Sequence, residues 1–169
     1  TTIEEVNAGA YRLRVSVIPG EPIRVTEVTL ALHGPGADEE PLKRQATAFP
    51  LKKGDVLLQQ RYEEAKGELI SRAQELGYLD ADFAVHEIHI AKTTSTADIR
   101  LELETGSRYF FNGARIEGGY DYPEEFVRRY LAFKPGEAFS YARLGETQLN
   151  FTNSERFREV NITPEKAES

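Results

Sequence analysis

The stretch LKKGDVL at residues 51–57 recurs as FKPGEAF at residues 133–139. Both copies keep an apolar residue, a lysine, any residue, a glycine, an acid and two apolar residues. A glycine at this place favours a tight turn, and each copy lies between two patterns with helical spacing. The recurrence predicts that the chain contains a repeated structural unit, which decides the architecture ahead of any local detail.

A second repeated block lies upstream of each turn, and its two copies are 86 positions apart. Each copy is a glycine followed by alternating apolar residues, which predicts a turn and then a strand. The matching residues are Gly20, Ile23, Val25, Val28 and Leu30 in the first copy and Gly106, Tyr109, Phe111, Ala114 and Ile116 in the second.

Two helices are predicted in each copy. The first covers 41–48 in one copy and 123–132 in the other. The second helix of copy one has Tyr62, Ala65, Leu69, Ala73 and Leu76 on one face, and Gly77 is placed to end it in the left-handed conformation. In copy two the corresponding face carries Leu144, Thr147 and Phe151, with Ser140 as the expected N-cap. Tyr62 and Leu79 are 17 positions apart in copy one, and the equivalent Leu144 and Phe157 are 13 positions apart in copy two. The second helix of copy two is therefore expected to be about one turn shorter.

Strand-like alternation follows the second helix over 82–90 and again over 99–103. Copy one is therefore predicted as β-α-α-β-β, whereas copy two ends after strand-like residues near Phe157 to Ile162 without a last strand. An alternating strand over 11–18 precedes the first copy. These patterns predict a remnant of a preceding module at 1–19, a complete module at 20–105 and a module lacking its last strand at 106–169, all cut from a longer protein.

The ordered blocks resemble the POTRA (polypeptide-transport-associated) domains of outer-membrane barrel assembly proteins, and among them the TamA-like translocation and assembly module family. The resemblance covers almost the whole chain. It is carried by VIPGEP at 17–22, LKKGD at 51–55, ELGYL at 75–79, GSRYFF at 106–111 and FKPGE at 133–137. One departure is Glu155, which stands where the family has glycine and argues against a left-handed helix end there.

The resemblance implies an α+β fold of tandem modules, each a small three-stranded mixed sheet with two helices on one face. It also implies the periplasmic portion of a Gram-negative outer-membrane protein with a C-terminal β-barrel. The expected partners are an inner-membrane-anchored TamB-like protein and client outer-membrane or autotransporter polypeptides. In the family, the strand after the second helix lies at a sheet edge and accepts an added strand.

Those edges are expected here at 82–90 and 158–163. A three-stranded sheet leaves edge strands whose free N–H and C=O groups can pair with an extended polypeptide. The candidate binding residues are Phe83, Val85, Glu87, Ile88, Ile90, Arg158, Val160 and Ile162. A Val85→Pro substitution is expected to weaken binding more than folding, because proline would remove a donor used only by an added strand.

Nothing in the sequence favours catalysis, a metal, a cofactor or a small-molecule substrate. His86 and His89 are three apart in a predicted strand and so face opposite sides, and His33 is expected in a turn beside Gly34. No cysteine is present, and no known catalytic or phosphate-binding motif is found. The net charge of -7 has the wrong sign for binding nucleic acid.

Two other interpretations remain open at this point. The modules could act as a structural spacer or cell-envelope scaffold in a division or secretion protein, since His86, Glu87 and His89 are polar residues of the kind that discourage strand addition. Alternatively, the unpaired strand at 11–18 and the incomplete last module could pair between molecules by a strand swap.

Overall fold

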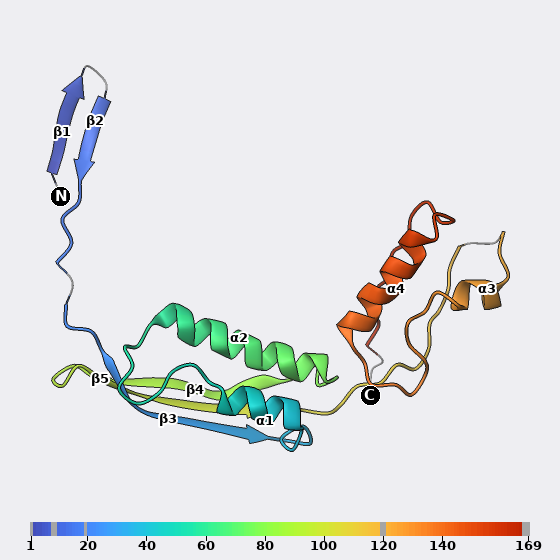
Figure 1. The fold of residues 1–169 in the computed structure, drawn as a ribbon, viewed down its shortest axis with the longest axis horizontal. Helices are drawn as coiled ribbons and strands as arrows, with labels where there is room; N and C mark the ends of the chain where they lie inside the picture. The colour runs from blue at the N-terminus through green and yellow to red at the C-terminus, as the bar shows by residue number, and fades with distance from the viewer. Residues whose placement is uncertain (1, 8–9, 19, 119–120, 167–169) are drawn as a thin grey trace.

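The computed structural model describes residues 2–7, 10–18, 20–118 and 121–166 (Figure 1). Within them, no helix is long and apolar enough to cross a membrane. In chain order, the elements are β1 (Thr2–Asn7), β2 (Ala10–Arg14), β3 (Arg24–His33), α1 (Glu40–Thr47), α2 (Gln59–Glu75), β4 (Asp82–Ala91), β5 (Thr96–Glu104), α3 (Glu124–Arg128) and α4 (Tyr141–Asn153).

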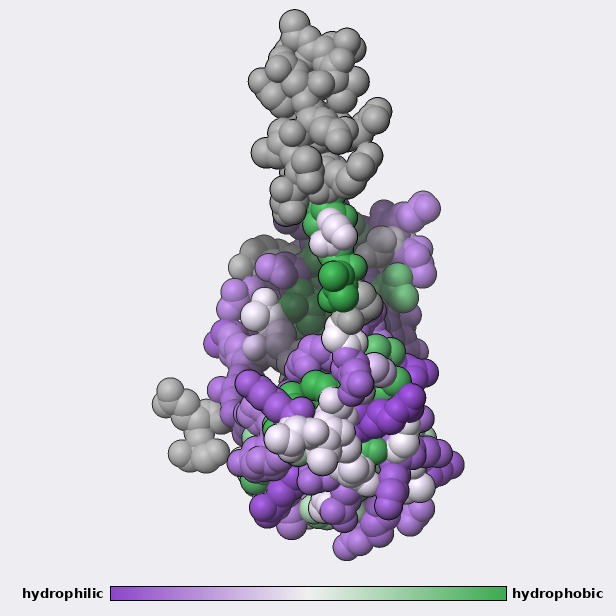
Figure 2. Space-filling model, turned by 90° about the vertical axis from the view of Figure 1, so that its left-hand side faces the viewer, coloured by the Kyte–Doolittle hydropathy of each residue, from purple (hydrophilic) through white to green (hydrophobic). Residues whose placement is uncertain are grey.

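The chain begins with an antiparallel pair, β1 and β2. The strand predicted over 11–18 is therefore present in part, because β2 ends at Arg14 and no strand is assigned to 15–18. These last residues form an exposed apolar stretch in which Val15, Val17 and Ile18 are 59%, 76% and 92% exposed. Figure 2 shows hydrophobic atoms directly beneath the grey ones, above an end of the first module that is largely hydrophilic.

The first module contains a three-stranded mixed sheet with the order β3-β5-β4. β5 is the central strand, parallel to β3 and antiparallel to β4. Both α1 and α2 lie on the same face of this sheet, and no helix of the described chain covers the other face (Figure 1). The predicted β-α-α-β-β order and the α+β fold are confirmed for this module.

The core lies between the helices and the central strand. β5 alternates so that Ile99, Leu101 and Leu103 are at most 1% exposed, and they face the helices. From the helical side, α2 contributes the predicted face, including the fully buried Leu69. Burial of one such leucine is worth about 1.5–3 kcal/mol, so the period of the apolar residues determines which face of α2 meets the sheet.

The second repeat, which was predicted to lack its last strand, does not form the other two predicted strands either. Between residues 107 and 166 the described part of the chain has α3, α4 and one isolated bridge from Phe110 to Ala138, with no named strand. The physical reason follows from the first module, in which β3 and β4 pair only with β5. No described segment of the second repeat takes that central place, so its flanking segments have no neighbour to pair with.

Aromatic packing holds the second repeat together instead. Phe151, on the buried face of α4, has its ring centroid 5.2 Å from that of Phe157 and 5.1 Å from that of Tyr130. A second cluster stacks Phe111 on Phe133 with ring centroids 3.9 Å apart. α3 is shorter than predicted and ends at Arg128.

The two repeated turns make the same backbone hydrogen bonds. Val25 N–H donates to Asp55 O at 2.9 Å, and the equivalent Phe111 N–H donates to Glu137 O at 2.9 Å. The turn glycines also agree, because Gly54 N–H and Gly136 N–H donate back to Val25 and Phe111 at 2.8 and 2.7 Å. The repeated sequence therefore folds into a repeated turn.

The two long helices have the predicted difference in length, but both ends of α4 differ from the prediction. α2 has 17 residues and α4 has 13, which is the predicted difference of one turn. Gly77 follows α2 with φ +97°, as expected. Glu155 adopts φ +54° after α4, so the left-handed conformation forms there despite the side chain. Ser140 occupies the N-cap position of α4 but its side chain makes no capping hydrogen bond.

Candidate protein-binding edge of the sheet

The strand after the second helix, β4, forms one edge of the sheet. The predicted edge at 82–90 is thus confirmed as an edge strand, Asp82–Ala91, with β5 on one side only. Its other side carries backbone groups that no strand of the described chain covers. Which residues carry those groups depends on the register.

The direction of the backbone groups in β5 can be established from two hydrogen bonds. Thr105 N–H donates to His33 O at 3.0 Å, and Arg24 N–H donates to Ser95 O at 2.9 Å. Both bonds join β3 to an odd-numbered residue that directly flanks β5, Thr105 in the first case and Ser95 in the second. Because N–H and C=O alternate sides along a strand, the even-numbered residues of β5 direct their backbone groups at β4.

The β4 residues opposite those even-numbered positions are Asp82, Val85, Glu87, His89 and Ala91. Their N–H and C=O groups face β5 and are used within the sheet. The alternating residues His86, Ile88 and Ile90 consequently direct their N–H and C=O groups to the free side. These three residues provide the backbone donors and acceptors that an added strand would use.

A β-bulge between Phe83 and Val85 determines this pattern. In a regular ladder without the bulge, Val85 would lie opposite Leu101 and would have its N–H on the free side. The expectation that Val85→Pro removes only an unused donor is therefore wrong, because this N–H faces β5. Phe83 does face outward, but its N–H already donates to Asp82 Oδ1 at 2.8 Å.

A sequence signal for the bulge was present. Phe83 and Ile88 both pack against the core although they are five positions apart, an odd separation that a regular strand cannot place on one face. Val85 continues the alternation that begins at Phe83, and the polar His86 and Glu87 follow it, so a simple alternation test does not detect this change of parity. Sequence reasoning therefore found the strand and missed which amides are free.

The side chains next to the free edge are partly apolar on the helical side of the sheet. Ile90 is 47% exposed, and Phe83 and Ile88 are partly buried. The Lys66 ammonium group lies 5.7 Å from the centroid of the Phe83 ring. A strand added to β4 would therefore meet some apolar surface on this side, in addition to the backbone pairing.

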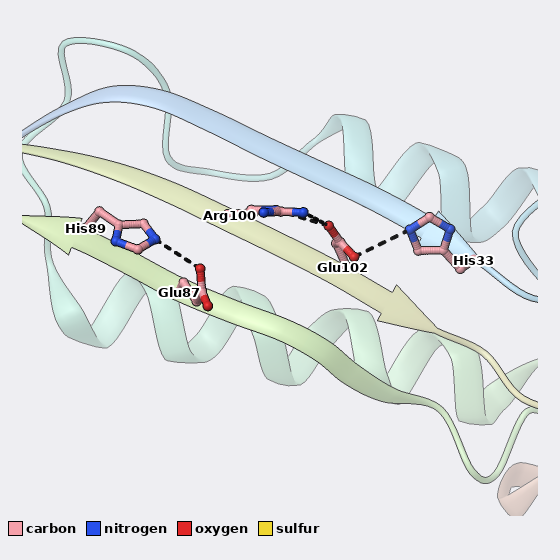
Figure 3. A network of polar contacts seen from close by, with 5 residues as sticks. All are labelled: His33, Glu87, His89, Arg100 and Glu102. Carbon is pink, nitrogen blue, oxygen red and sulfur yellow. Dashed lines mark hydrogen bonds and ion pairs between the residues drawn. The ribbon is translucent and has the colours of Figure 1, made fainter.

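The opposite face of the sheet is polar and exposed (Figure 3). His89 Nε2 lies 2.9 Å from Glu87 Oε2, and Arg100 Nε donates to Glu102 Oε1 at 3.0 Å. Figure 3 also shows His33 beside Glu102, so His33 lies at the end of β3 and not in the predicted turn. Within the described ranges no cluster of three or more side chains suited to a metal is found.

The second predicted edge, at 158–163, is not a strand. Among its candidate residues, Arg158 is exposed, and Val160 and Ile162 are partly buried. Gln148 Nε2 on α4 donates to Val160 O at 3.0 Å, so this segment is held by a helix side chain and not by a sheet. The cause is the missing central strand described above, and the binding role of these residues stays a prediction.

The segment that joins the two modules is bonded to both of them. Tyr109 N–H donates to Gly77 O at 2.8 Å, and Phe139 N–H donates to Tyr109 O at 2.9 Å. A side chain at Gly77 would place its Cβ 3.2 Å from Tyr109 O and 3.3 Å from Phe139 O. Glycine is required at this point both for the positive φ and for the close approach of the second module.

Side chains reinforce the same junction. Arg108 Nε donates to Leu76 O at 2.8 Å, and its guanidinium lies 3.2 Å from Glu39 Oε1. Lys166 Nζ donates to Asp80 at 2.7 Å, and the Tyr109 hydroxyl donates to the same carboxylate at 2.6 Å. The ammonium group of Lys166, followed by the hydroxyl of Tyr109, holds the pKa of Asp80 below its ordinary value. The same contact with Asp80 raises the pKa of Lys166.

Comparison with known proteins identifies the type of module. Residues 36–106 match the POTRA family model, which is described as a surface antigen variable number repeat. This range runs from the loop after β3 through α1, α2, β4 and β5, and therefore contains the candidate edge.

Two solved structures have a similar fold. POTRA domains 3–5 of BamA from Haemophilus influenzae match with 17% identity and a TM-score of 0.56, covering 83% of this chain and 53% of that one. BamA from Haemophilus ducreyi lacking POTRA domains 1–3 matches with 14% identity and a TM-score of 0.63, covering 83% of this chain and 26% of that one. The chain thus has the POTRA fold, and it spans about half of the first structure and a quarter of the second.

Proposed function

We propose that this chain is the periplasmic, partner-binding part of a TamA-like outer-membrane protein assembly factor, and that β4 binds an extended segment of another polypeptide as an added strand. The observation that carries the proposal is the free set of N–H and C=O groups on His86, Ile88 and Ile90 at an uncovered sheet edge. Backbone pairing depends little on sequence, which suits a protein that handles many different chains.

The proposed partners follow from the kind of protein that the chain is similar to. They are a TamB-like protein anchored in the inner membrane, client outer-membrane or autotransporter polypeptides, and a C-terminal β-barrel in the same protein. The similarity of this fold to POTRA domains of BamA supports a place beside a barrel. Their periplasmic location would bring client chains past β4 before they reach the outer membrane.

The mechanism is binding and transfer without catalysis. A backbone hydrogen bond contributes about 0.5–1.5 kcal/mol net, so pairing along three outward residues gives a weak and reversible complex. The weak affinity lets a client leave toward the barrel. Several modules in series would retain it through effective concentration.

Amide hydrogen exchange tests the proposal in an alternating pattern. In the free chain, the amides of Glu87 and His89 are expected to be protected and those of Ile88 and Ile90 to exchange fast, because only the former bond to β5. Saturation with the purified periplasmic part of the TamB-like partner should slow Ile88 and Ile90 selectively. Unchanged exchange at both positions, with binding verified by another method, would overturn the proposal.

Proline substitutions provide a matched pair for the same edge. His86→Pro should leave the fold intact and abolish partner binding, because its N–H faces outward and its side chain is exposed. Glu87→Pro should destabilise the sheet, because it removes a bond to β5 and proline cannot donate. A folded His86→Pro variant that binds with unchanged affinity would contradict strand addition at β4.

A structural spacer or scaffold is the second candidate function. It is favoured by the junction, in which the residues Arg108 and Tyr109 are bonded to groups of the first module. It is also favoured by exposed polar side chains on β4, including the Glu87–His89 pair. If neither partner nor client protects any β4 amide, the spacer function is the one that remains.

A further inference from the structure

Asn112 and Gly113 form the only Asn-Gly pair in the sequence. An asparagine before glycine is prone to lose its side-chain amide, because glycine has no Cβ to hinder the approach of its own nitrogen to the asparagine Cγ. The other asparagines, at 7, 150, 153 and 161, are followed by alanine, phenylalanine, serine and isoleucine. The sequence therefore distinguishes one asparagine as the most reactive of the chain.

The structure leaves both reacting groups exposed. Residues 111–117 have no helix, strand or turn, and Asn112 and Gly113 are both exposed within this segment. Among the residues that the structure describes, no hydrogen bond is made by the Asn112 side chain or by the Gly113 N–H. Neither group is therefore held away from the other by a bond that would have to break first.

The first module shows why this segment is open. Asn112 corresponds to Thr26, which lies 86 positions earlier in β3. There Thr26 Oγ1 donates to Ala97 O of β5 at 3.0 Å, and the strand on either side of it pairs with β5. The described part of the second repeat has no strand in the place of β5. Asn112 and Gly113 consequently lack the sheet that restrains their counterparts.

The backbone at Gly113 requires the residue that makes Asn112 reactive. Gly113 has φ +145°, a region in which a residue with a Cβ is strained. An added Cβ would meet no atom within 4 Å, so the constraint is the backbone angle and not the space around it. The fold therefore retains a glycine at 113, and with it the unhindered nitrogen beside the Asn112 amide.

We infer that Asn112 is a site of spontaneous deamidation, which converts it into aspartate and isoaspartate as the protein ages. The Gly113 nitrogen gives its proton to hydroxide or water and attacks Asn112 Cγ. A bond from Cγ to this nitrogen forms, the bond from Cγ to Nδ2 breaks, and Nδ2 takes up a proton from water and leaves as ammonia. Water then adds to one of the two carbonyl carbons of the cyclic imide, which opens as aspartate or isoaspartate. The inference does not depend on the proposed function.

Isoaspartate adds one methylene group to the main chain between two anchored positions. On one side, Phe111 O accepts from Gly136 N–H at 2.7 Å, and the Phe111 side chain is buried. On the other side, Arg128 Nη2 on α3 donates to Ala114 O at 3.2 Å. The added length has to be accommodated between these two bonds. Isoaspartate should therefore weaken the attachment of the segment to α3, whereas aspartate keeps the normal main chain.

The test is incubation of the folded 1–169 chain in mildly alkaline buffer, followed by peptide mapping with mass spectrometry. Asn112 should lose its amide at least several times faster than Asn161. This second asparagine is the internal control, because it is also exposed and outside any helix or strand but precedes the β-branched Ile162. Protein isoaspartyl methyltransferase should label the Asn112 peptide, which identifies isoaspartate among the products.

Three variants make the result specific. Ile162→Gly gives Asn161 the same neighbour that Asn112 has, and should raise the rate at Asn161 toward that of Asn112 while circular dichroism shows an intact fold. Asn112→Ser removes the amide and should abolish the methyltransferase label at this peptide. Asn112→Asp carries the charge of the aspartate product without the added methylene. The isoaspartate form, separated from aged protein, should unfold at a lower urea concentration than this variant.

Several outcomes would overturn the inference. Equal rates at Asn112 and Asn161 would show that the glycine and the open segment confer no reactivity. Loss of the amide only in urea would show that the folded chain holds the two groups apart. An unchanged rate at Asn161 in folded Ile162→Gly would contradict the part assigned to glycine. Equal urea midpoints for the isoaspartate form and Asn112→Asp would contradict the expected effect on α3.

Discussion

At the scale of single residues, the hydroxyl of Tyr62 is a polar group inside the core that lowers the stability of the fold. Its side chain is almost fully buried, at 2% exposed, and its hydroxyl has no hydrogen-bond partner among the residues that the structure describes. Burial, with a smaller effect from Glu63, raises the pKa of this hydroxyl. A buried polar group without a partner opposes folding, so Tyr62 is placed for its ring and not for its oxygen.

We predict that Tyr62→Phe leaves the stability unchanged or raises it by up to about 1 kcal/mol, because the ring is kept and the unpaired oxygen is lost. Tyr78→Phe is the matched control and should be destabilising by about 1 kcal/mol, because the Tyr78 hydroxyl donates to Glu39 Oε1. Urea denaturation at neutral pH measures both effects. A clear loss of stability in Tyr62→Phe would show that the hydroxyl has a partner in solution.

Tyr62→Phe should also change how the stability depends on pH in the alkaline range. Because the folded pKa of Tyr62 is raised, the folded state favours its neutral form. This contribution is fully present below the unfolded pKa of about 10 and is lost as the pH rises toward the folded pKa. Tyr62→Phe should therefore lose less stability than the wild type between neutral pH and the alkaline range.

At the scale of elements, the two long helices end in the same backbone conformation with different residues. Gly77 N–H donates to Gln74 O after α2, and Glu155 N–H donates to Thr152 O after α4. Both positions have positive φ, which glycine adopts freely and a residue with a Cβ adopts at a cost of about 1–2 kcal/mol. The turn after α4 therefore forms with a residue that is poorly suited to it.

We predict that Glu155→Gly stabilises the second module by up to about 1 kcal/mol, after allowance for the greater freedom of glycine in the unfolded chain. Gly77→Ala should have the opposite effect, with an added cost from the contact of its Cβ with Tyr109 O. Thermal and urea unfolding of both variants test this pair. Destabilisation by Glu155→Gly would indicate that the Glu155 side chain makes a stabilising contact.

At the scale of the whole molecule, the junction between modules depends on a few groups at one place. Arg108 bonds to Leu76 O, pairs with Glu39, and lies with its guanidinium 5.6 Å from the Tyr78 ring centroid. Its side chain is 35% exposed, so solvent screens these contacts only in part. One side chain of the second module thus holds three groups of the first.

We predict that Arg108→Ala loosens the modules relative to each other without unfolding either of them. Residual dipolar couplings should require separate alignment tensors for the two modules in the variant and a common tensor in the wild type. Arg115→Ala is the control, because Arg115 is 70% exposed and, among the residues that the structure describes, its ion pairs are with Glu117 and Glu165. A common tensor in Arg108→Ala would place the rigidity in the backbone bonds of Tyr109 instead.

Across the whole molecule, the helices could be predicted from the sequence more fully than the sheets. The buried face of α2, the positive φ of Gly77 and the one-turn difference between α2 and α4 were all predictable, because helix period and turn chemistry depend on neighbouring residues. The edge position of β4 was predicted only through resemblance. For the second repeat, only the lack of the last strand was predicted. The lack of its other two strands was not, because a strand depends on a partner distant in sequence.

Sequence patterns alone predict the repeat, the order of elements in the first module and the apolar faces that form its core. Tertiary structure decided which amides of β4 are free, because one bulge beside Phe83 changes the direction of every later backbone group. It also decided that Asn112 and Gly113 are exposed in a segment that pairs with no strand of the described chain. The reason is the same in both cases: local spacing fixes side-chain faces, whereas backbone pairing and surface shape arise only when distant segments meet.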